Sequence, residues 1–383
     1  MGSDHRLKIA VLTSSRADFG VYLPLLRALR SNSTEFDLEI IAFGTHLSPF
    51  HGKTIDLILK HGFEVKHRIT SMLLTDDEDS IATTYALTAL KFADLWSQNK
   101  DRFDWVLCLG DRYEMAAAVA AGIPFGIRFA HIGGGDTTLG AIDNIYRHSI
   151  SLASAIHFVS LESFADRVKQ IVGEHARCVV TGSLSLDNLN DIKILSKEAF
   201  FVEWGIDLNI PTVLVTIHPE TICSQNNLKY CKETIKALTV LGRDQQLLIT
   251  MPNADTSSSM FRKAFETLQQ NNPEHVKLIE NFGTESYFTA MFHVDYLLGN
   301  TSSGIVEAAS FGKFVVNIGD RQKGRLTSGN VVHVPFLSNE IIKACKNTTG
   351  KKYTGSNVYK KGNSTNIIID ALKKMDSILE TKN

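Results

Sequence analysis

Short apolar runs alternate with stretches of helical periodicity along the first half of the chain. The runs that predict buried strands are 7–13, 38–43, 105–109, 126–131 and 157–159. The stretches in which apolar residues recur every three or four positions, and which predict helices, are 19–30, 80–98, 114–121, 142–153 and 162–172. Strands that alternate with helices in this way predict a parallel sheet covered by helices on both faces.

The same alternation begins again after Thr181-Gly182-Ser183. The strands predicted in this half are 212–217, 247–251, 276–279, 296–298, 314–318 and 331–334, and the helices are 228–241, 260–271 and 286–292. We therefore predict an α/β protein with two domains, at 7–185 and 200–363, and a terminal helix at 364–380.

Composition and charge narrow the class of protein. The chain has 383 residues, which is more than a single hydrophobic core usually serves, and its 44% hydrophobic and 21% charged residues are ordinary for a soluble enzyme. A net charge of −1 gives no overall attraction to nucleic acid or to an anionic membrane. The five cysteines form no C-x-x-C pair, which favours reduced thiols over a zinc site, and no apolar run is long enough to cross a bilayer. A cytoplasmic protein without nucleic-acid or membrane partners and without a bound metal is expected.

The loop Gly299-Asn300-Thr301-Ser302-Ser303-Gly304 is the most informative segment of the sequence. It lies between a predicted strand and a helix-like run that starts at Ile305. Free backbone N–H groups and small hydroxyls at a helix N-terminus favour a bound phosphate. Glu307, one turn further on, could accept hydrogen bonds from ribose hydroxyls, so the loop predicts a nucleotide-linked substrate.

Other polar residues follow predicted strands in both halves. They are Arg16, His46, Asp111, the loop 133–136, His218, Asn253 and the loop 301–303. Ligands of such sheets bind beyond the carboxyl ends of the strands, so two facing edges predict a site in an interdomain cleft.

Arg16 and Asp111 each allow a second interpretation. Arg16 could neutralise a diphosphate with its planar fork of donors, or it could be a surface residue paired with Asp18. Asp111 could be an acid–base group or the cap of the helix that follows, and Arg112 beside it could keep that carboxylate ionised or contact the substrate.

Three consecutive glycines, 133–135, allow a close approach of the backbone to a ligand, and they are flanked by His131 and Asp136. Asp136 and Asp143, with His131 close by, could supply a base and an acid, although a glycine-rich turn with capping aspartates is the alternative. His218 is a candidate for catalysis or a structural histidine. Asn253 could contact a base or a ribose. The basic loop 319–325, which contains Arg321, is either a solvated charge run or a second source of positive charge.

Taken together, seven motifs make the sequence recognisable. They are 15–18 (SRAD), 110–114 (GDRYE), 131–148 (HIGGGD through IYRH), 217–221 (IHPET), 252–255 (PNAD), 299–304 (GNTSSG) and 319–325 (GDRQKGR). In this order they resemble the hydrolysing UDP-N-acetylglucosamine 2-epimerases of sialic acid biosynthesis. The resemblance spans nearly the whole chain and implies a GT-B-like fold, with two Rossmann-like domains and a terminal helix that returns to the first domain.

The resemblance also implies a reaction that needs no cofactor. A base removes the C2 proton of the sugar, UDP leaves to give a 2-acetamidoglucal, and water adds to give N-acetylmannosamine. It further implies the roles of single residues. Asp111 and Asp143 would be acid–base carboxylates, with Arg112 supporting Asp111, and His218 would serve the sugar or the diphosphate; Asp136 is a catalytic candidate from its own loop. Arg16, Thr301, Ser302 and Ser303 would hold the diphosphate, Glu307 the ribose, Asn253 the uridine side, and Arg321 would organise that end; His46 and His131 complete the expected binding set.

One position departs from the family pattern. Many members have His-Ile-Glu-Gly-Gly, and this chain has Gly133 in place of that glutamate, with Asp136 as the nearest carboxylate. The expected substrate is UDP-N-acetylglucosamine. The alternative is a UDP- or GDP-linked 2,4-diacetamido-2,4,6-trideoxyhexose of legionaminic acid synthesis, whose extra acetamido group needs the room that glycine leaves. A GT-B glycosyltransferase and a non-catalytic nucleotide-sugar sensor are the rival functions, and the resemblance suggests a homodimer or homotetramer.

Overall fold

A computed structural model describes residues 6–49, 52–75, 77–222, 224–252 and 257–380. Seven parallel strands form the first sheet in the order β3-β2-β1-β4-β5-β6-β7. Their bounds are β1 Leu7–Thr13, β2 Phe36–Phe43, β3 His67–Ile69, β4 Trp105–Leu109, β5 Phe129–Ile132, β6 Ser154–Val159 and β7 Cys178–Val180. Because both faces carry buried apolar side chains, helices must cover both of them.

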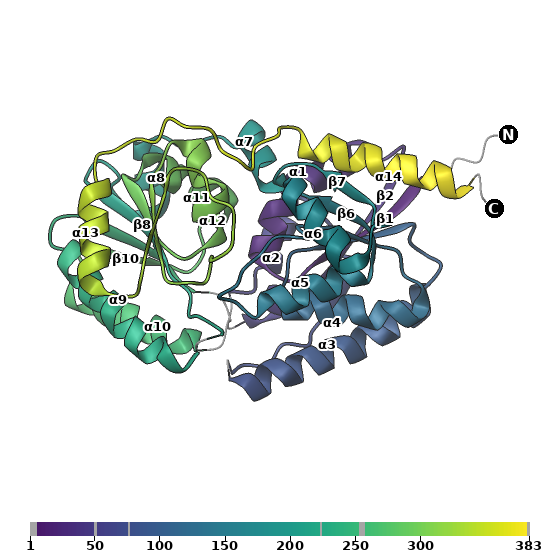
Figure 1. Ribbon diagram of the computed structural model, residues 1–383, viewed down its shortest axis with the longest axis horizontal. Helices are drawn as coiled ribbons and strands as arrows, with labels where there is room; N and C mark the ends of the chain where they lie inside the picture. Colours follow the sequence, from purple (N-terminus) through teal and green to yellow (C-terminus); the bar gives the residue numbers. More distant parts are fainter. Residues whose placement is uncertain (1–5, 50–51, 76, 223, 253–256, 381–383) are drawn as a thin grey trace.

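The helices of the first domain separate into two layers (Figure 1). Helices α1 (Arg16–Ser31) and α2 (Ile55–Lys60) share one apolar cluster with β1. Helices α3 (Glu78–Asn99), α4 (Tyr113–Gly122) and α5 (Asp143–Leu152) contribute to the cluster on the opposite face. Helix α6 (Glu162–Val172) lies against the edge strand β7.

The second sheet has six parallel strands in the order β10-β9-β8-β11-β12-β13. Their bounds are β8 Thr212–Thr216, β9 Gln246–Thr250, β10 Val276–Ile279, β11 Tyr296–Gly299, β12 Val315–Ile318 and β13 Val331–Val334. The helices on one face are α9 Asn227–Leu241, α10 Ser258–Asn271 and α13 Ser338–Thr348, and those on the other are α8 Lys197–Trp204 and α11 Gly283–His293. The short helix α12 (Ser302–Val306) lies against β11 and β12, and the short helix α7 (Asn188–Asp191) lies in the connection between the two domains.

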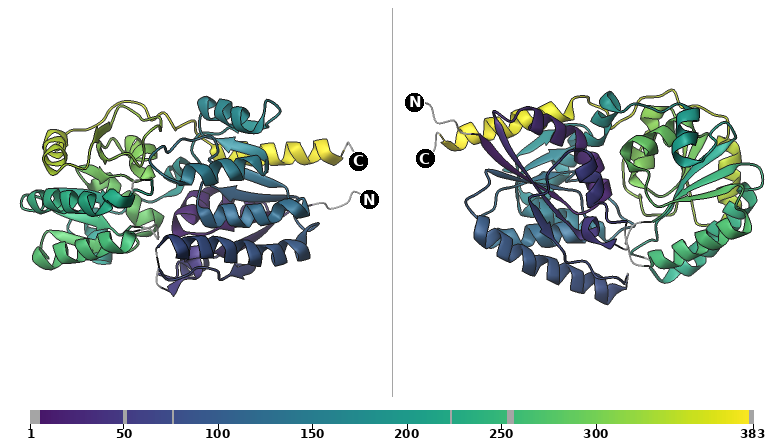
Figure 2. Two further views of the ribbon diagram at one scale, coloured as in Figure 1. Left: turned by 60° about the horizontal axis from the view of Figure 1, so that its bottom comes forward. Right: turned by 180° about the vertical axis from the view of Figure 1, so that it is seen from behind.

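The terminal helix α14 (Ser364–Glu380) returns to the first domain, as all three views show (Figures 1 and 2). Its Ile368 and Leu372 are buried in the same cluster as the side chains of α1. The carboxylate of Asp187 accepts the backbone N–H groups of Ser364 and Thr365 at 3.2 and 2.7 Å, so it caps the helix where the chain crosses back.

The two domains touch directly at the loop before α5. The backbone N–H of Leu139 donates to the carbonyl oxygen of Lys323 at 2.8 Å, and that of Ile142 donates to the Thr221 hydroxyl at 3.0 Å. A Cβ atom on Gly140 would lie 2.0 Å from the carbonyl oxygen of Asp320, so only glycine permits this approach.

The predicted α/β class with two parallel sheets is confirmed. The sequence analysis did not predict β3, β7, α2, α8 or α13. The two strands are three residues long, which is too short for a periodicity to be visible. Helix α12 begins at Ser302, three residues before the predicted start.

Candidate active site

The carboxyl ends of both sheets open into one cavity of about 450 Å³. It is lined by most of the predicted site residues: Arg16, Asp111, Arg112, Asp136, Asp143, His218, Thr301, Ser302, Ser303, Glu307 and Arg321. His46 and His131 are not among the lining residues, and Asn253 lies outside the described residues. The expected cleft between the domains is therefore present.

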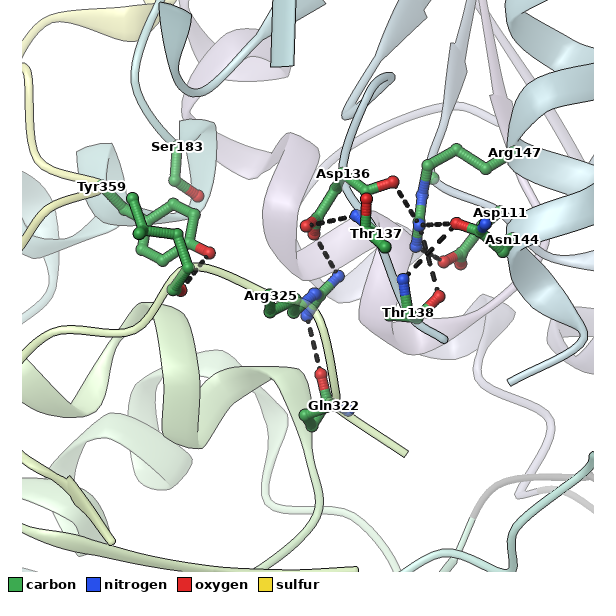
Figure 3. A network of polar contacts seen from close by, with 12 residues as sticks. Asp111, Asp136, Thr137, Thr138, Asn144, Arg147, Ser183, Gln322, Arg325 and Tyr359 are labelled. Carbon is green, nitrogen blue, oxygen red and sulfur yellow. Dashed lines mark hydrogen bonds and ion pairs between the residues drawn. The ribbon is translucent and has the colours of Figure 1, made fainter. Parts of the chain in front are cut away.

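Asp111 lies one residue beyond Gly110 at the end of β4 and is held by Arg147 of α5. The Arg147 guanidinium donates to Asp111 Oδ2 (Figure 3). Burial acts to raise the pKa of Asp111, but the positive charges of Arg147, Arg325, Arg321 and Arg112 outweigh it, and the pKa lies below its usual value. Asp111 is consequently a carboxylate at neutral pH and can accept a proton.

Arg147 was not predicted as a site residue, although it is the most connected side chain here. Its side chain is 1% exposed. It also donates to the backbone oxygen of Asp136 at 2.9 Å, to Asn144 Oδ1 at 3.2 Å and to Thr138 Oγ1 at 3.3 Å (Figure 3). The sequence contained a weak signal for it, because Arg147 follows Asp143 by four positions and therefore lies on the same face of the helix.

Both carboxylate oxygens of Asp136 have partners. Oδ1 accepts the N–H of Thr137 at 2.8 Å, and Oδ2 lies 2.6 Å from the guanidinium of Arg325, which belongs to the second domain (Figure 3). Arg325 also donates to Gln322 Oε1 at 3.1 Å. The sequence analysis placed Arg325 only within a basic loop and missed this pair.

The positive charge of Arg112 helps to lower the pKa of Asp111, which agrees with the expected support, and its guanidinium also pairs with Glu114. Its Nε and one terminal nitrogen donate to the two carboxylate oxygens of Glu114 at 3.1 and 2.9 Å. Glu114 is fully buried, and burying a charge requires such a partner.

Arg16 is not paired with Asp18. The carboxylate of Asp18 accepts the N–H groups of Ser14 and Ser15 at 2.8 and 3.1 Å and forms a capping box at the start of α1. The Arg16 guanidinium instead crosses to the second domain, where it donates to the carbonyl oxygen of Glu280 and, at 3.4 Å, to that of Met251. Burial lowers its pKa, partly against the charge of Glu280.

His46 and His131 lie behind the wall of the cavity. His131 Nε2 is 2.9 Å from the carbonyl oxygen of Gly110, and Nδ1 is 3.0 Å from the Ser151 hydroxyl. A carbonyl only accepts, so Nε2 carries the proton. Burial lowers the pKa of His131 to about 3 and that of His46 to about 4, so both rings are neutral at physiological pH and support the loops in front of them.

The loop after β11 forms the second-domain side of the cavity. Thr301 is the N-cap of α12, and its first-turn residues Ser302 and Ser303 line the cavity. The Ser303 hydroxyl is 2.9 Å from that of Tyr287. Because α12 has only five residues, local N–H groups and hydroxyls matter more here than a long helix dipole.

Asn300 and Gln322 form three hydrogen bonds that position the neighbouring loops against the loop after β11. Asn300 accepts the N–H of His218 at 2.7 Å and donates to the His218 carbonyl at 2.8 Å. Gln322 Nε2 donates to the Asn300 carbonyl at 2.8 Å. His218 and Arg321 are thereby held at the same end of the cavity as Thr301.

Glu307 contributes a buried carboxylate to this end. Its Oε1 accepts the hydroxyl of Ser185, while Oε2 has no hydrogen-bond partner among the described residues. Burial raises the pKa of Glu307 to about 7, although the Ser185 hydrogen bond and the charge of Arg325 oppose this. Such a group is suited to accept from a ligand hydroxyl.

The parts of the chain that the structure describes contain neither a candidate metal site nor a candidate membrane-spanning helix. They contain no group of three or more His, Cys, Asp or Glu side chains placed to hold a metal ion. No helix within them has both the length and the apolar character needed to cross a membrane.

The fold and the site define a two-domain, GT-B-like nucleotide-sugar enzyme. The profile of the family described as UDP-N-acetylglucosamine 2-epimerase matches residues 27–373, and the chain belongs to this family. It is a hydrolysing nucleotide-sugar 2-epimerase, the class that the resemblance of its motifs implied.

Two relatives and one solved structure illustrate the match. The GDP/UDP-N,N'-diacetylbacillosamine 2-epimerase (hydrolyzing) of Campylobacter jejuni is 33% identical over 90% of this chain and 88% of its own. The UDP-N,N'-diacetylbacillosamine 2-epimerase (hydrolyzing) of Legionella pneumophila is 30% identical over 96% and 95%. The UDP-GlcNAc 2-epimerase of Methanocaldococcus jannaschii, solved with UDP-GlcNAc and UDP, has a TM-score of 0.80 at 18% identity and covers 96% of this chain and 100% of that one.

Proposed function

We propose that the protein hydrolyses a UDP- or GDP-linked 2,4-diacetamido-2,4,6-trideoxyhexose with inversion at C2, for the synthesis of a legionaminic acid-type sugar. The observation that supports the proposal is the lack of a side chain at Gly133, which lines the cavity together with Gly110 and Asp111. The nearest atoms to a Cβ placed there are backbone atoms of Gly110, at 3.8 and 3.9 Å. The names of the two relatives at 30% identity or more support the same sugar.

UDP-N-acetylglucosamine is the second candidate substrate. The description of the matching family names this nucleotide sugar. The sequence alone favoured it, and we reverse the order because Gly133 carries no side chain at the cavity and the names of two relatives at 30% identity or more give a diacetamido sugar.

The proposed reaction proceeds in two halves. A base removes the C2 proton while the bond between C1 and the diphosphate oxygen breaks, and the nucleoside diphosphate leaves with the bonding electrons. Water then adds its hydroxyl to C1, and a proton returns to C2 from the opposite face, giving the free 2-epimer. We assign the proton transfers to Asp111, Asp143 and His218, since these ionisable side chains line the cavity, the two aspartates from the first domain and His218 from the second.

We assign the other end of the cavity to the leaving group. Thr301, Ser302 and Ser303 are proposed to hold the phosphates, and Arg321 and Arg16 to supply positive charge as the diphosphate departs. Glu307 is proposed to accept from the ribose. Asn253 remains our candidate for the uridine side, and a homodimer or homotetramer remains the expected assembly.

Incubation of the purified protein with the UDP-linked diacetamido sugar, its GDP-linked counterpart and UDP-N-acetylglucosamine, without an acceptor, tests the proposal. We expect free 2-epimer and nucleoside diphosphate, with the highest kcat/KM on a diacetamido sugar. A higher kcat/KM on UDP-N-acetylglucosamine would establish the second candidate. An absence of turnover on all three would refute both.

A further inference from the structure

We propose that Asp136 and Arg325 form a positioning pair that couples the second domain to Asp111 through Arg147. This inference rests on the proposed function for its kinetic readout. It replaces the expected role of Asp136 as a catalytic carboxylate, a role that the loss of a glutamate at position 133 had suggested.

The side-chain contacts of Asp136 are the first evidence for the positioning pair. Its side chain is 10% exposed, Oδ1 is occupied by the Thr137 N–H, and Oδ2 is paired with Arg325 at 2.6 Å. Each carboxylate oxygen keeps a second lone pair, so these bonds alone do not decide against a base. What they do is tie the Asp136 side chain to a backbone donor of its own loop and to a guanidinium of the second domain.

The backbone carbonyl of Asp136 connects the positioning pair to Arg147. Its carbonyl oxygen accepts from Arg147 at 2.9 Å, and the other terminal nitrogen of Arg147 reaches Asp111 (Figure 3). The contacts thus run from Gln322 and Arg325 in the second domain through Asp136 to Arg147 and Asp111. The adjacent Leu139–Lys323 and Ile142–Thr221 hydrogen bonds fix the same loop across the cleft.

In this arrangement the second domain contributes both orientation and positive charge at Asp111. The ionisable groups that face Asp111 come from its own loop, from β5, from α5 and the loop before it, and from the second domain: Arg112, His131, Arg147, Asp143, Asp136, Arg321 and Arg325. Only the last two depend on the position of the second domain. When the domains separate, Asp111 loses two of its four cations and Arg147 loses an anchored partner.

Two substitutions separate this pairing from direct catalysis by Asp136. Arg325→Met removes a positive charge near Asp111, so the acidic limb of kcat/KM should move to higher pH. Asp136→Asn removes a negative charge and keeps the Thr137 acceptor, so the limb should move to lower pH. Each should reduce kcat by roughly 10- to 100-fold, the scale of a small misplacement of a reacting group. The double variant should return the limb close to its wild-type position.

The matched control is the exposed ion pair between Lys361 and Glu162, which joins the returning chain to α6 outside the cavity. Lys361→Met and Glu162→Gln should change neither kcat nor the pH profile. If Asp136→Asn instead abolishes turnover at every pH and the double variant does no better, Asp136 is the base and the positioning pair is refuted.

Hydrogen exchange of the segment around Leu139 gives a readout that needs no substrate. The Leu139 amide should exchange faster in Arg325→Met than in wild type or Lys361→Met, because its bond to the Lys323 carbonyl depends on closure. Unchanged exchange would overturn the coupling, whatever the enzyme acts on. If the wild type turns over none of the three nucleotide sugars but exchange behaves as expected, the proposed function fails and the coupling stands.

Discussion

The hydroxyl of Ser185, at the end of the first domain, donates a hydrogen bond to the buried carboxylate of Glu307 in the second domain. This contact joins the connection between the domains to the proposed ribose site. It also leaves the second oxygen of Glu307 without a partner among the described residues, so a ligand hydroxyl can complete the set.

Glu307 should therefore release a proton when UDP binds. Its raised pKa, about 7, means that the carboxyl is substantially protonated at pH 6.5, and a donated ribose hydrogen bond favours the ionised form. Calorimetry in buffers of different ionisation enthalpy measures the proton number. Glu307→Gln should release fewer protons and bind UDP roughly 10- to 100-fold more weakly.

The glutamine variant also corrects for the proton that UDP itself releases, because only the difference between the proteins counts.

The same raised pKa of Glu307 predicts how the stability of the protein changes with pH. Any stability linked to the protonated Glu307 is complete below the unfolded value near pH 4.5 and is lost as pH rises through about 7. Without ligand, the stability of Glu307→Gln relative to wild type should thus increase over that range. In the calorimetric measurement, equal proton release by wild type and Glu307→Gln when UDP binds would exclude Glu307 from the ribose contact.

Asp111→Asn should reduce kcat by at least about 10³-fold, since Asn cannot accept the proton. UDP affinity should change only a few-fold, because the phosphate loop at 301–303 lies at the other end of the cavity. Steady-state kinetics and calorimetry measure the two effects separately. An unchanged kcat would remove Asp111 from the mechanism.

His131 should behave as a support and not as a proton carrier. The pKa of about 3 predicts that its ring stays neutral, with the proton on Nε2, from pH 8 to pH 5. Nitrogen NMR of the histidine rings would record this directly. His131→Phe leaves the Gly110 carbonyl and the Ser151 hydroxyl without a partner, so unfolding by urea should show a loss of about 1–3 kcal/mol.

The sequence predicted the strands with clear apolar runs, such as β4, whose bounds 105–109 agree with the structure. It missed α13, although that helix has 11 residues, because the buried face contains only Ile341, Ala344, Cys345 and Thr348 and is weakly apolar. It did not distinguish His131 from the cavity-lining Ile132, because successive side chains of a strand point to opposite sides and a position at a strand end does not say which side is open.

The contacts between domains were beyond the reach of the sequence. Asp136 and Arg325 lie in different domains, and no local pattern indicates that they meet. Arg16 illustrates the same limit: its sequence neighbour Asp18 was the plausible partner, whereas the structure places backbone carbonyls of the second domain there. Contacts of this kind are determined by how the two folded domains pack against each other.

Gly133→Ala should lower the preference for a diacetamido sugar. The residue has a φ of +88°, so any side chain brings strain, but that strain acts equally on both substrates. The ratio of kcat/KM for the diacetamido sugar to that for UDP-N-acetylglucosamine should therefore fall, by about 10-fold or more if the added methyl meets the C4 acetamido group. A ratio equal to that of the wild type would place the C4 substituent elsewhere.

Turnover in D₂O distinguishes elimination at C2 from direct hydrolysis of the glycosyl bond. We expect the released sugar to have inverted configuration at C2, to carry deuterium at that carbon, and to appear together with one equivalent of nucleoside diphosphate. Release of the sugar with its original C2 configuration and without deuterium would show simple hydrolysis of the glycosyl bond and would contradict the account.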